Sequence, residues 1–350
     1  MTVARVARWD LDKTYLRTEF ATFRDLVRTA FERADEKRTN PGAASLMREM
    51  ALAGHEVHIL SGSPQQMRRR LEEKLRMDGI EWASFTLKPN LQNLLKLRFR
   101  ALRDQLGYKL PMLLAARARV VEGGAAPYPR ESLFGDDAEA DAFVYSLYSD
   151  VLASRVPDSV LADTCAKGRL YESDIARIVA TARSLANRDP EPEPVSRILI
   201  HLEGQTAPGN FDVYGSKVVP FYNYLQAAFV LYEDESIPAS AVLRVATELV
   251  ILHRFDGDQL ARSYRELARR GHLRGVGLEA LQEEAERWKT APQTDGAPAS
   301  AVKTVLRMVE LLPPFFEVAQ STWKAPAERP LPDYATLVLR HNRRHRDTED

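Results

Sequence analysis

The alternation of short β-like runs with amphipathic helical stretches is the feature that most constrains the fold of this 350-residue chain. The β-like runs of the first half are "VARVARW" (residues 3–9), "EVHIL" (56–60), "ASFTL" (83–87) and "ESLF" (131–134). Helical patterns, with apolar residues three to four positions apart, lie between them over residues 20–31, 43–54, 64–79, 91–107 and 109–121. This order predicts an α/β fold with a largely parallel sheet and helices on both faces.

The second half of the chain is predicted to be mostly helical. One further strand-like run, "RILIHLE" (197–203), follows a proline-rich break, so residues 150–194 are expected to form a helical insertion in the same sheet domain. After a loop at 204–210, helices are expected over 221–232, 239–254, 258–271, 278–289 and 301–312. We therefore predict a core over residues 1–205, an α-helical C-terminal region over 206–325 and a flexible tail over 326–350.

The amino-acid composition indicates which kinds of partner and which cellular compartment to expect. Lys plus Arg and Asp plus Glu are equal at 49 each, so the overall charge predicts neither a nucleic-acid nor a membrane-surface partner. The chain has one cysteine, Cys165, and no apolar run long enough to span a bilayer, which together predict a cytoplasmic protein without a transmembrane segment. The histidines, among them His55 and His201, lack the spacing of a zinc site and are expected to be structural or exposed.

Polar residues that can carry chemistry gather where the predicted strands end. In a doubly wound sheet, ligands bind beyond the carboxyl ends of the strands. The residues at these ends are Asp10, Asp12 and Thr14 after the first strand, Ser61 and Gly62 after the second, and Asp136, Asp137 and Asp141 after "SLF". Lys109, predicted to open the helix before that last strand, adds an ammonium group. The set joins carboxylates, a hydroxyl and a cation at one edge of the sheet.

These residues resemble the four motifs of the haloacid dehalogenase (HAD) superfamily of phosphohydrolases. The motifs occur in order as "DLDKT", "ILSGS", "YKL" and "GDDAEAD", and the resemblance covers residues 3–150. "SGSP" followed by Gln65 or Gln66, together with Tyr145, is most similar to the phosphatidate phosphatase branch related to the actin-patch protein of fungi. The resemblance implies a Rossmann-like core and Mg²⁺-dependent hydrolysis of phosphoric monoesters.

The resemblance also implies a role for each acid. Asp10 would attack phosphorus and become an aspartyl-phosphate, and Asp12 would protonate the leaving group and then deprotonate water. Mg²⁺ would be held by the side chains of Asp10 and Asp136 and by the backbone carbonyl of Asp12. Asp141 or Asp137 would orient a water molecule bound to the metal.

The remaining motif residues would hold the phosphoryl group. Ser61 and the backbone amides near Gly62 would donate hydrogen bonds to phosphate oxygens, with Thr14 supporting the turn after the first strand. Lys109 would bind both the phosphate and Asp10. Lys88 in "LKP" is a rival for the motif lysine, but Lys109 leads directly to the strand that ends in Asp136.

Each motif taken singly has a structural explanation. "DLDKT" could begin a calcium loop, but Tyr15 and Ala21 stand where such a loop needs Gly and Glu. "GDDAEAD" could be an acidic helix N-terminus, and Arg5 and Arg8 are unusual in a central parallel strand. The joint order of the motifs on strand ends favours the functional interpretation.

The spacing between the motifs leaves no room for a large cap domain, so substrate choice is expected to depend on other parts of the chain. "NFDVYGSKVVPFYNYLQ" (210–226), with its aromatic residues and Lys217, could line the site or simply form a core helix. A phosphorylated small molecule or a lipid phosphate is the expected substrate. Alternative functions are a phosphotransferase or phosphomutase on the same site, or a catalytically silent protein-interaction module.

Overall fold

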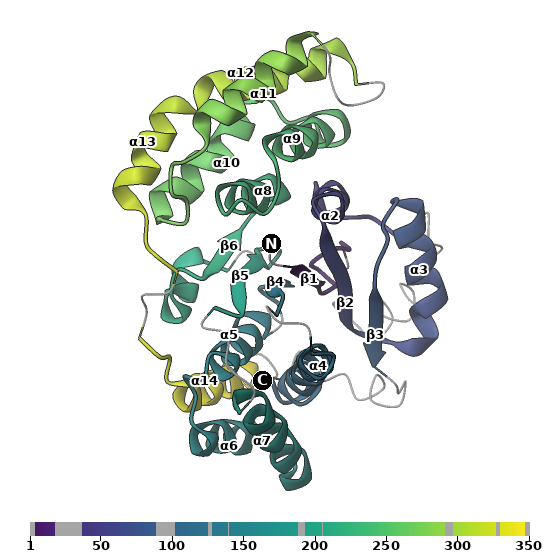
Figure 1. Ribbon diagram of the computed structural model, residues 1–350, viewed down its shortest axis with the longest axis vertical. Helices are drawn as coiled ribbons and strands as arrows, with labels where there is room; N and C mark the ends of the chain where they lie inside the picture. Colours follow the sequence, from purple (N-terminus) through teal and green to yellow (C-terminus); the bar gives the residue numbers. More distant parts are fainter. Residues whose placement is uncertain are drawn as a thin grey trace.

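The computed structural model describes residues 4–17, 37–88, 102–124, 128–138, 140–187, 193–204, 206–290, 297–326 and 330–346. Within these ranges six strands form one sheet in the order β3-β2-β1-β4-β5-β6, and every neighbouring pair is parallel (Figure 1). The strands are β1 (Arg5–Trp9), β2 (His55–Pro64), β3 (Ser84–Lys88), β4 (Arg130–Asp136), β5 (Val195–His201) and β6 (Val218–Phe221). The predicted parallel α/β fold is confirmed.

Helices cover both faces of the sheet (Figure 1). One face packs against α2 (Ala43–Leu52), α3 (Arg68–Met77) and α8 (Tyr224–Glu233), and the other against α4 (Leu102–Glu122) and α5 (Asp141–Leu152). Successive residues of a strand point to opposite faces, so Leu199 of β5 joins one apolar core while Ile198 and Ile200 join the other. A strand buried on both sides reads as the continuous apolar run seen in β5.

Two groups of helices extend these layers at opposite ends of the molecule. Beyond α8 lie α9 (Ala239–His253), α10 (Gly257–Arg270), α11 (Leu278–Thr290), α12 (Ala299–Leu311) and α13 (Pro313–Thr322). Beyond α4 and α5 lie α6 (Asp158–Lys167), α7 (Glu172–Ala186) and α14 (Tyr334–Arg346), as Figure 1 shows. Two short 3₁₀ turns, η1 (Gln65–Met67) and η3 (Pro208–Tyr214), complete the described elements.

Three elements differ from the expectations. The region after residue 206 contains β6, a strand of four residues whose Pro220 is tolerated because β6 lies at the sheet edge. The helix α4 is continuous through Pro111, so Lys109 lies inside a helix rather than at its start. The region expected to be a flexible tail contains α14, whose Tyr334 is buried and hydrogen bonds to Asp150.

Other sequence expectations stay predictions. The helix predicted over residues 20–31 and the first part of the one predicted over 91–107 lie outside the described residues. The absence of a large cap stays a prediction for the same reason. The domain boundary at residue 205 is also untested, although β5 and β6 pair across it.

A buried ion pair explains the arginine in the central strand. Arg8 Nε lies 2.7 Å from Glu131 Oε2 on the neighbouring β4, and Tyr148 Oη donates to the same carboxylate at 3.1 Å. Burial opposes ionisation of Glu131, but the charges of Arg8 and Arg117 hold its pKa below the usual value. Arg8 is therefore a paired core residue and does not argue against β1.

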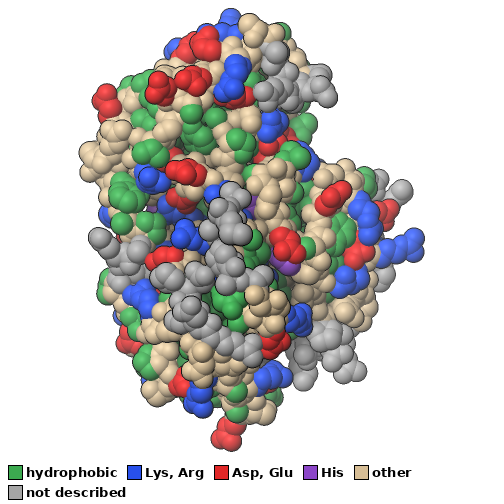
Figure 2. Space-filling view, viewed as in Figure 1, with side chains coloured by type: hydrophobic (Ala, Val, Ile, Leu, Met, Phe, Trp, Pro, Cys, Tyr) green, Lys and Arg blue, Asp and Glu red, His purple; other side chains and the backbone are tan. Residues whose placement is uncertain are grey.

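The described surface is mixed in charge. Figure 2 shows basic and acidic side chains intermixed over the visible face, in line with the equal totals of the sequence. Among the described helices, none combines the length and the apolar character that crossing a membrane requires.

Candidate functional site

The order of the strands brings the predicted site residues to one edge of the sheet. β1 lies between β2 and β4, so the chain after β1 runs between the ends of these two neighbours. Asp10 and Asp12 follow β1, Ser61 lies in β2, and Asp136 ends β4. The strands β2 and β3 lie on one side of β1, and β4, β5 and β6 lie on its other side. A point where the strand order reverses in this way, the switch point, is where α/β sheets commonly bind ligands.

Three acids of the described residues converge beside one lysine. Asp10, Asp136 and Asp141 each offer a carboxylate oxygen, and these oxygens lie within 4.8 Å of one another. Lys109 Nζ lies 3.4 Å from Asp10 Oδ1 and also pairs with Asp141. The exposed fraction of all four residues is 1% or less. Three buried carboxylates gathered this closely are suited to bind a cation in addition to their ion pairs with Lys109.

Asp12 occupies a separate position, held by two serines of β2. Its Oδ2 accepts a hydrogen bond from Ser61 Oγ at 3.1 Å and another from Ser63 Oγ at 2.5 Å. The backbone amide of Ser63 donates to Ser61 Oγ at 2.9 Å, which fixes the first hydroxyl. Asp12 is therefore oriented toward β2, while Asp10 faces Lys109.

The structure distinguishes the two candidate acids after β4. Asp137 turns away from the cluster, and its carboxylate accepts hydrogen bonds from the amides of Gly204 and Thr206 at 2.6 and 2.8 Å. Asp141 lies in the cluster and accepts a bond from the Asp136 amide at 3.2 Å. A Cβ on Gly135 would lie 2.5 Å from that of Asp141, so only glycine leaves room for this side chain.

The turn after β1 is held by side chains from three distant segments. Lys13 has a φ of 61°, a left-handed conformation that costs free energy in a non-glycine residue. Its carbonyl accepts hydrogen bonds from Asn40 at 2.9 Å and from the His201 ring at 3.0 Å. The Thr14 carbonyl accepts from Asn40 at 2.8 Å and from Tyr224 Oη at 2.5 Å. Four hydrogen bonds from three side chains therefore hold the turn in its strained conformation.

Two of these supporting side chains are neutral. Burial lowers the pKa of His201, and a ring nitrogen that contacts a carbonyl must carry its proton to donate. Burial, with the charges of Asp136 and Asp10 adding to it, raises the pKa of Tyr224 well above its usual value. Both groups therefore support the turn as hydrogen-bond donors, without placing a charge beside the acids.

The other predicted residues are placed as follows. Thr14 is buried and its Oγ1 lies 3.4 Å from Asp10 Oδ2. A Cβ on Gly62 would have no neighbour within 4 Å, so the backbone there is open. Lys88 lies outside the acid cluster, with its Nζ 5.2 Å from the ring centre of Tyr108. Lys217 lies just before β6, and its Nζ is 2.8 Å from Glu193 Oε2. It is therefore at the amino end of a strand and not at the carboxyl ends, where the acids lie.

Several residues of the site were missed by sequence reasoning. Ser63 stands two positions after Ser61, a spacing that places both side chains on the same side of an extended strand. Asn40, His201 and Tyr224 carry no such sequence pattern, because the fold alone brings them to the turn. The sequence allows the aromatic segment around Tyr224 to line the site or to form a core helix. In the structure Tyr224 does both, because its ring is buried in the core and its hydroxyl donates to the turn.

No protein-family model, no curated protein and no solved structure matches this chain. The interpretation of the site therefore depends on the chemistry and placement of its own residues.

Proposed function

We propose that the protein is a Mg²⁺-dependent phosphoric monoester hydrolase of the HAD type. The observation that carries this proposal is the buried cluster of Asp10, Asp136 and Asp141 around Lys109, with Asp12 beside it, at the switch point of a parallel sheet. Acidic residues are common on protein surfaces without any function, whereas a buried cluster of acids needs an explanation. Acids are rarely buried without a purpose, and here three buried carboxylates lie within 4.8 Å of one another.

The donor set of the cluster suits Mg²⁺. This ion prefers oxygen ligands and is typically bound through one or two carboxylates plus water and substrate phosphate. Asp10 and Asp136, with the backbone carbonyl of Asp12, would hold the ion, and Asp141 would orient a water beside it. When bound, the ion supplies positive charge that neutralises phosphate oxygens.

The first chemical step uses both aspartates after β1. An oxygen of Asp10 attacks phosphorus while the bond from phosphorus to the ester oxygen breaks, which leaves an aspartyl-phosphate. Asp12 gives its proton to the departing oxygen, so the alcohol leaves neutral. Lys109, paired with Asp10 at 3.4 Å, keeps the nucleophile in place and offers charge to the phosphate.

The second step returns the site to its starting state. Asp12, now ionised, takes a proton from water, and the water oxygen attacks phosphorus of the aspartyl-phosphate. The bond from phosphorus to Asp10 breaks, which releases phosphate and restores the carboxylate. Ser61, with the open backbone at Gly62, is suited to hold the phosphate oxygens through both steps.

The test is release of inorganic phosphate from a panel of aryl, sugar, nucleotide and lipid phosphates, with Mg²⁺ or with EDTA. We expect Mg²⁺-dependent release that falls by about a thousandfold or more in Asp10→Asn, since the nucleophile is lost. Asp163→Asn on α6, a matched change far from the sheet edge, should leave the rate unchanged.

Absence of release by the wild type from every ester would contradict the proposal. Phosphate carried to a second acceptor instead of water would indicate the transferase alternative. Beryllofluoride binding without turnover would indicate an assembled but silent site. The comparison of Asp141→Asn with Asp137→Asn tests the assignment of the second acid, because only Asp141 lies in the cluster.

A further inference from the structure

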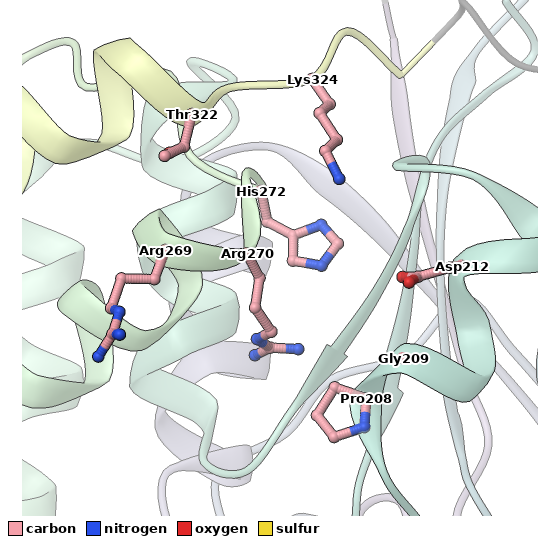
Figure 3. Close-up of a pocket in the computed structure, with 8 residues that line it drawn as sticks. All are labelled: Pro208, Gly209, Asp212, Arg269, Arg270, His272, Thr322 and Lys324. Carbon is pink, nitrogen blue, oxygen red and sulfur yellow. The ribbon is translucent and has the colours of Figure 1, made fainter.

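A concave site that includes none of the clustered acids lies beside the edge strand β6. This pocket of about 360 Å³ is bounded by η3, by the end of α10 and by the chain that follows α13 (Figure 3). Its lining includes Arg269, Arg270, His272 and Lys324, with Asp212 facing them from η3. The end of α10, the turn after it and the chain after α13 thus bring basic side chains to one cavity of the size that binds small molecules.

The pocket contains two buried polar atoms without a hydrogen-bond partner among the described residues. Arg270 is held by the Pro220 carbonyl at 2.7 Å and by Glu266 at 2.6 Å, but its Nε has no partner. His272 is 8% exposed, and its Nδ1 also has no partner. Buried polar groups are nearly always satisfied, so two such atoms in one cavity indicate groups that a ligand would complete.

The electrostatic environment of the pocket is positive. Burial, with the charges of Arg270, Arg197 and Lys324 adding to it, lowers the pKa of His272 to about 3. Burial disfavours any charge, but the part of this lowering that comes from Arg270, Arg197 and Lys324 shows a positive potential at the ring. A positive potential favours an anion in the pocket.

The dipole of α10 explains only part of this arrangement. Basic residues are favoured in the last turn of a helix, which accounts for Arg269 and Arg270 without any ligand. It does not account for Lys324, which belongs to the chain after α13. Near the end of α10 the Ala268 carbonyl is already occupied, since it accepts from Gly271 and Thr322.

We propose that this pocket binds a phosphate-bearing small molecule, with its phosphate between Arg270, His272 and Lys324. The inference does not depend on the proposed hydrolase activity. Three basic side chains, those of Arg270, His272 and Lys324, lie around the pocket (Figure 3), more than the two oxygens of a carboxylate would engage, whereas a phosphate has several acceptor oxygens. Arg270 Nε donates to one of them, and His272 Nδ1 accepts from a P–OH group or, when protonated, donates. Asp212 suits a hydroxyl group on the rest of the ligand.

The probe is inorganic phosphate, titrated at constant ionic strength while the ring resonances of His272 are followed by NMR after selective histidine labelling. We expect a saturable shift of the His272 signal, identified by its loss in His272→Gln. In Arg269→Ala/Lys324→Ala, phosphate affinity should fall about tenfold or more, because the donor Lys324 and the further positive charge of Arg269 at the pocket rim are removed. Both side chains are exposed, so this variant should fold.

The matched control is Arg287→Ala/Lys289→Ala, which removes the same charge from exposed positions of α11 and should bind phosphate as the wild type does. Acetate, the carboxylate probe, should bind much more weakly than phosphate. Asp10→Asn should leave the His272 response intact, which separates this pocket from the acid cluster. A linear, unsaturated shift of His272, or equal affinity in the pocket and control variants, would overturn the proposal.

Discussion

Two serine hydroxyls converge on one oxygen of Asp12, and this contact defines what the second aspartate can do. Ser61 and Ser63 both donate to Asp12 Oδ2, at 3.1 and 2.5 Å. A bound phosphate would draw Ser61 into its own hydrogen bonds, but Ser63 would remain available to Asp12. Ser63 is thus suited to be the positioning residue of the proposed proton donor.

We predict that Ser63→Ala lowers kcat mainly for esters with poor leaving groups. An alkyl alkoxide needs a proton in order to leave, whereas a nitrophenolate hardly does, so misplacing Asp12 matters only for the first. The expected loss is about tenfold larger for an alkyl phosphate than for nitrophenyl phosphate. Ser63→Thr keeps the hydroxyl and should recover most of the difference.

Ser84→Ala provides the control, because this β3 serine hydrogen bonds to His58 rather than to Asp12. Equal losses on both esters in Ser63→Ala would show that Ser63 supports the fold of β2 and not proton transfer.

The site acids could be predicted from sequence because each follows or ends a recognisable strand. Parallel strands end at a common edge, so Asp10, Ser61 and Asp136 had to meet once β1, β2 and β4 were neighbours. The choice between Asp137 and Asp141 could not be made in this way. It depends on Gly135, whose missing Cβ gives Asp141 its space, and on the loop amides that bind Asp137.

Between elements, α8 connects the outer helices to the turn that carries the proposed nucleophile. Its first residue, Tyr224, stacks on Trp9 of β1 at 5.7 Å between ring centres and donates to the Thr14 carbonyl. Asn40, shortly before α2, donates to both Lys13 and Thr14. Two elements on the same face of the sheet therefore hold one strained turn.

We predict that Asn40→Ala destabilises the protein more than Tyr224→Phe. The tyrosine change keeps the ring stack and removes one hydrogen bond, with a cost of about 1 kcal/mol in the free energy of unfolding. The asparagine change removes two donors to buried carbonyls and should cost about 2–3 kcal/mol. Urea denaturation measures both, and Tyr222→Phe, at a 46% exposed neighbour, serves as the control. The reverse order would mean that α8, and not Asn40, dominates support of the turn.

Elements with strong periodicity were predictable, and short or interrupted ones were not. The strands β1 to β5 each carry aliphatic or aromatic residues at successive or alternate positions, such as Ile198 to Ile200 in β5. β6 has four residues with Pro220 among them, so only pairing with β5 identifies it as a strand. The sequence predicted a break between helices 91–107 and 109–121, yet Leu106 and Leu110 are buried on both sides of it, and packing keeps α4 continuous.

For the whole molecule, stability against acid depends on buried titratable groups, most of which lie outside the proposed site. Burial lowers the pKa of His55 and His201, and the pKa of His272 falls to about 3. The unfolded chain binds these protons near pH 6.5 and the folded chain does not, so stability falls as pH drops below 6.5. For His272 the loss is about 1.4 kcal/mol at pH 5.5.

Glu233 opposes this trend. Burial raises its pKa to about 7, although Tyr264 Oη at 2.5 Å and the Gly275 amide at 3.1 Å donate to it. Between pH 7 and 4.5 the folded state therefore holds a proton that the unfolded state lacks, and stability from this residue rises as pH falls. From pH 7.5 to 5.5 the gain is about 2 kcal/mol.

We therefore predict that Glu233→Gln makes the protein more sensitive to mild acid. Its free energy of unfolding should fall by about 2 kcal/mol more than that of the wild type between pH 7.5 and 5.5, because the histidine effect is then unopposed. Urea denaturation at both pH values measures the difference, with Glu283→Gln on the exposed face of α11 as the control. Parallel pH profiles for wild type and Glu233→Gln would mean that donors such as Tyr264 and the Gly275 amide keep Glu233 ionised throughout, and that hydrogen bonding outweighs burial at this carboxyl.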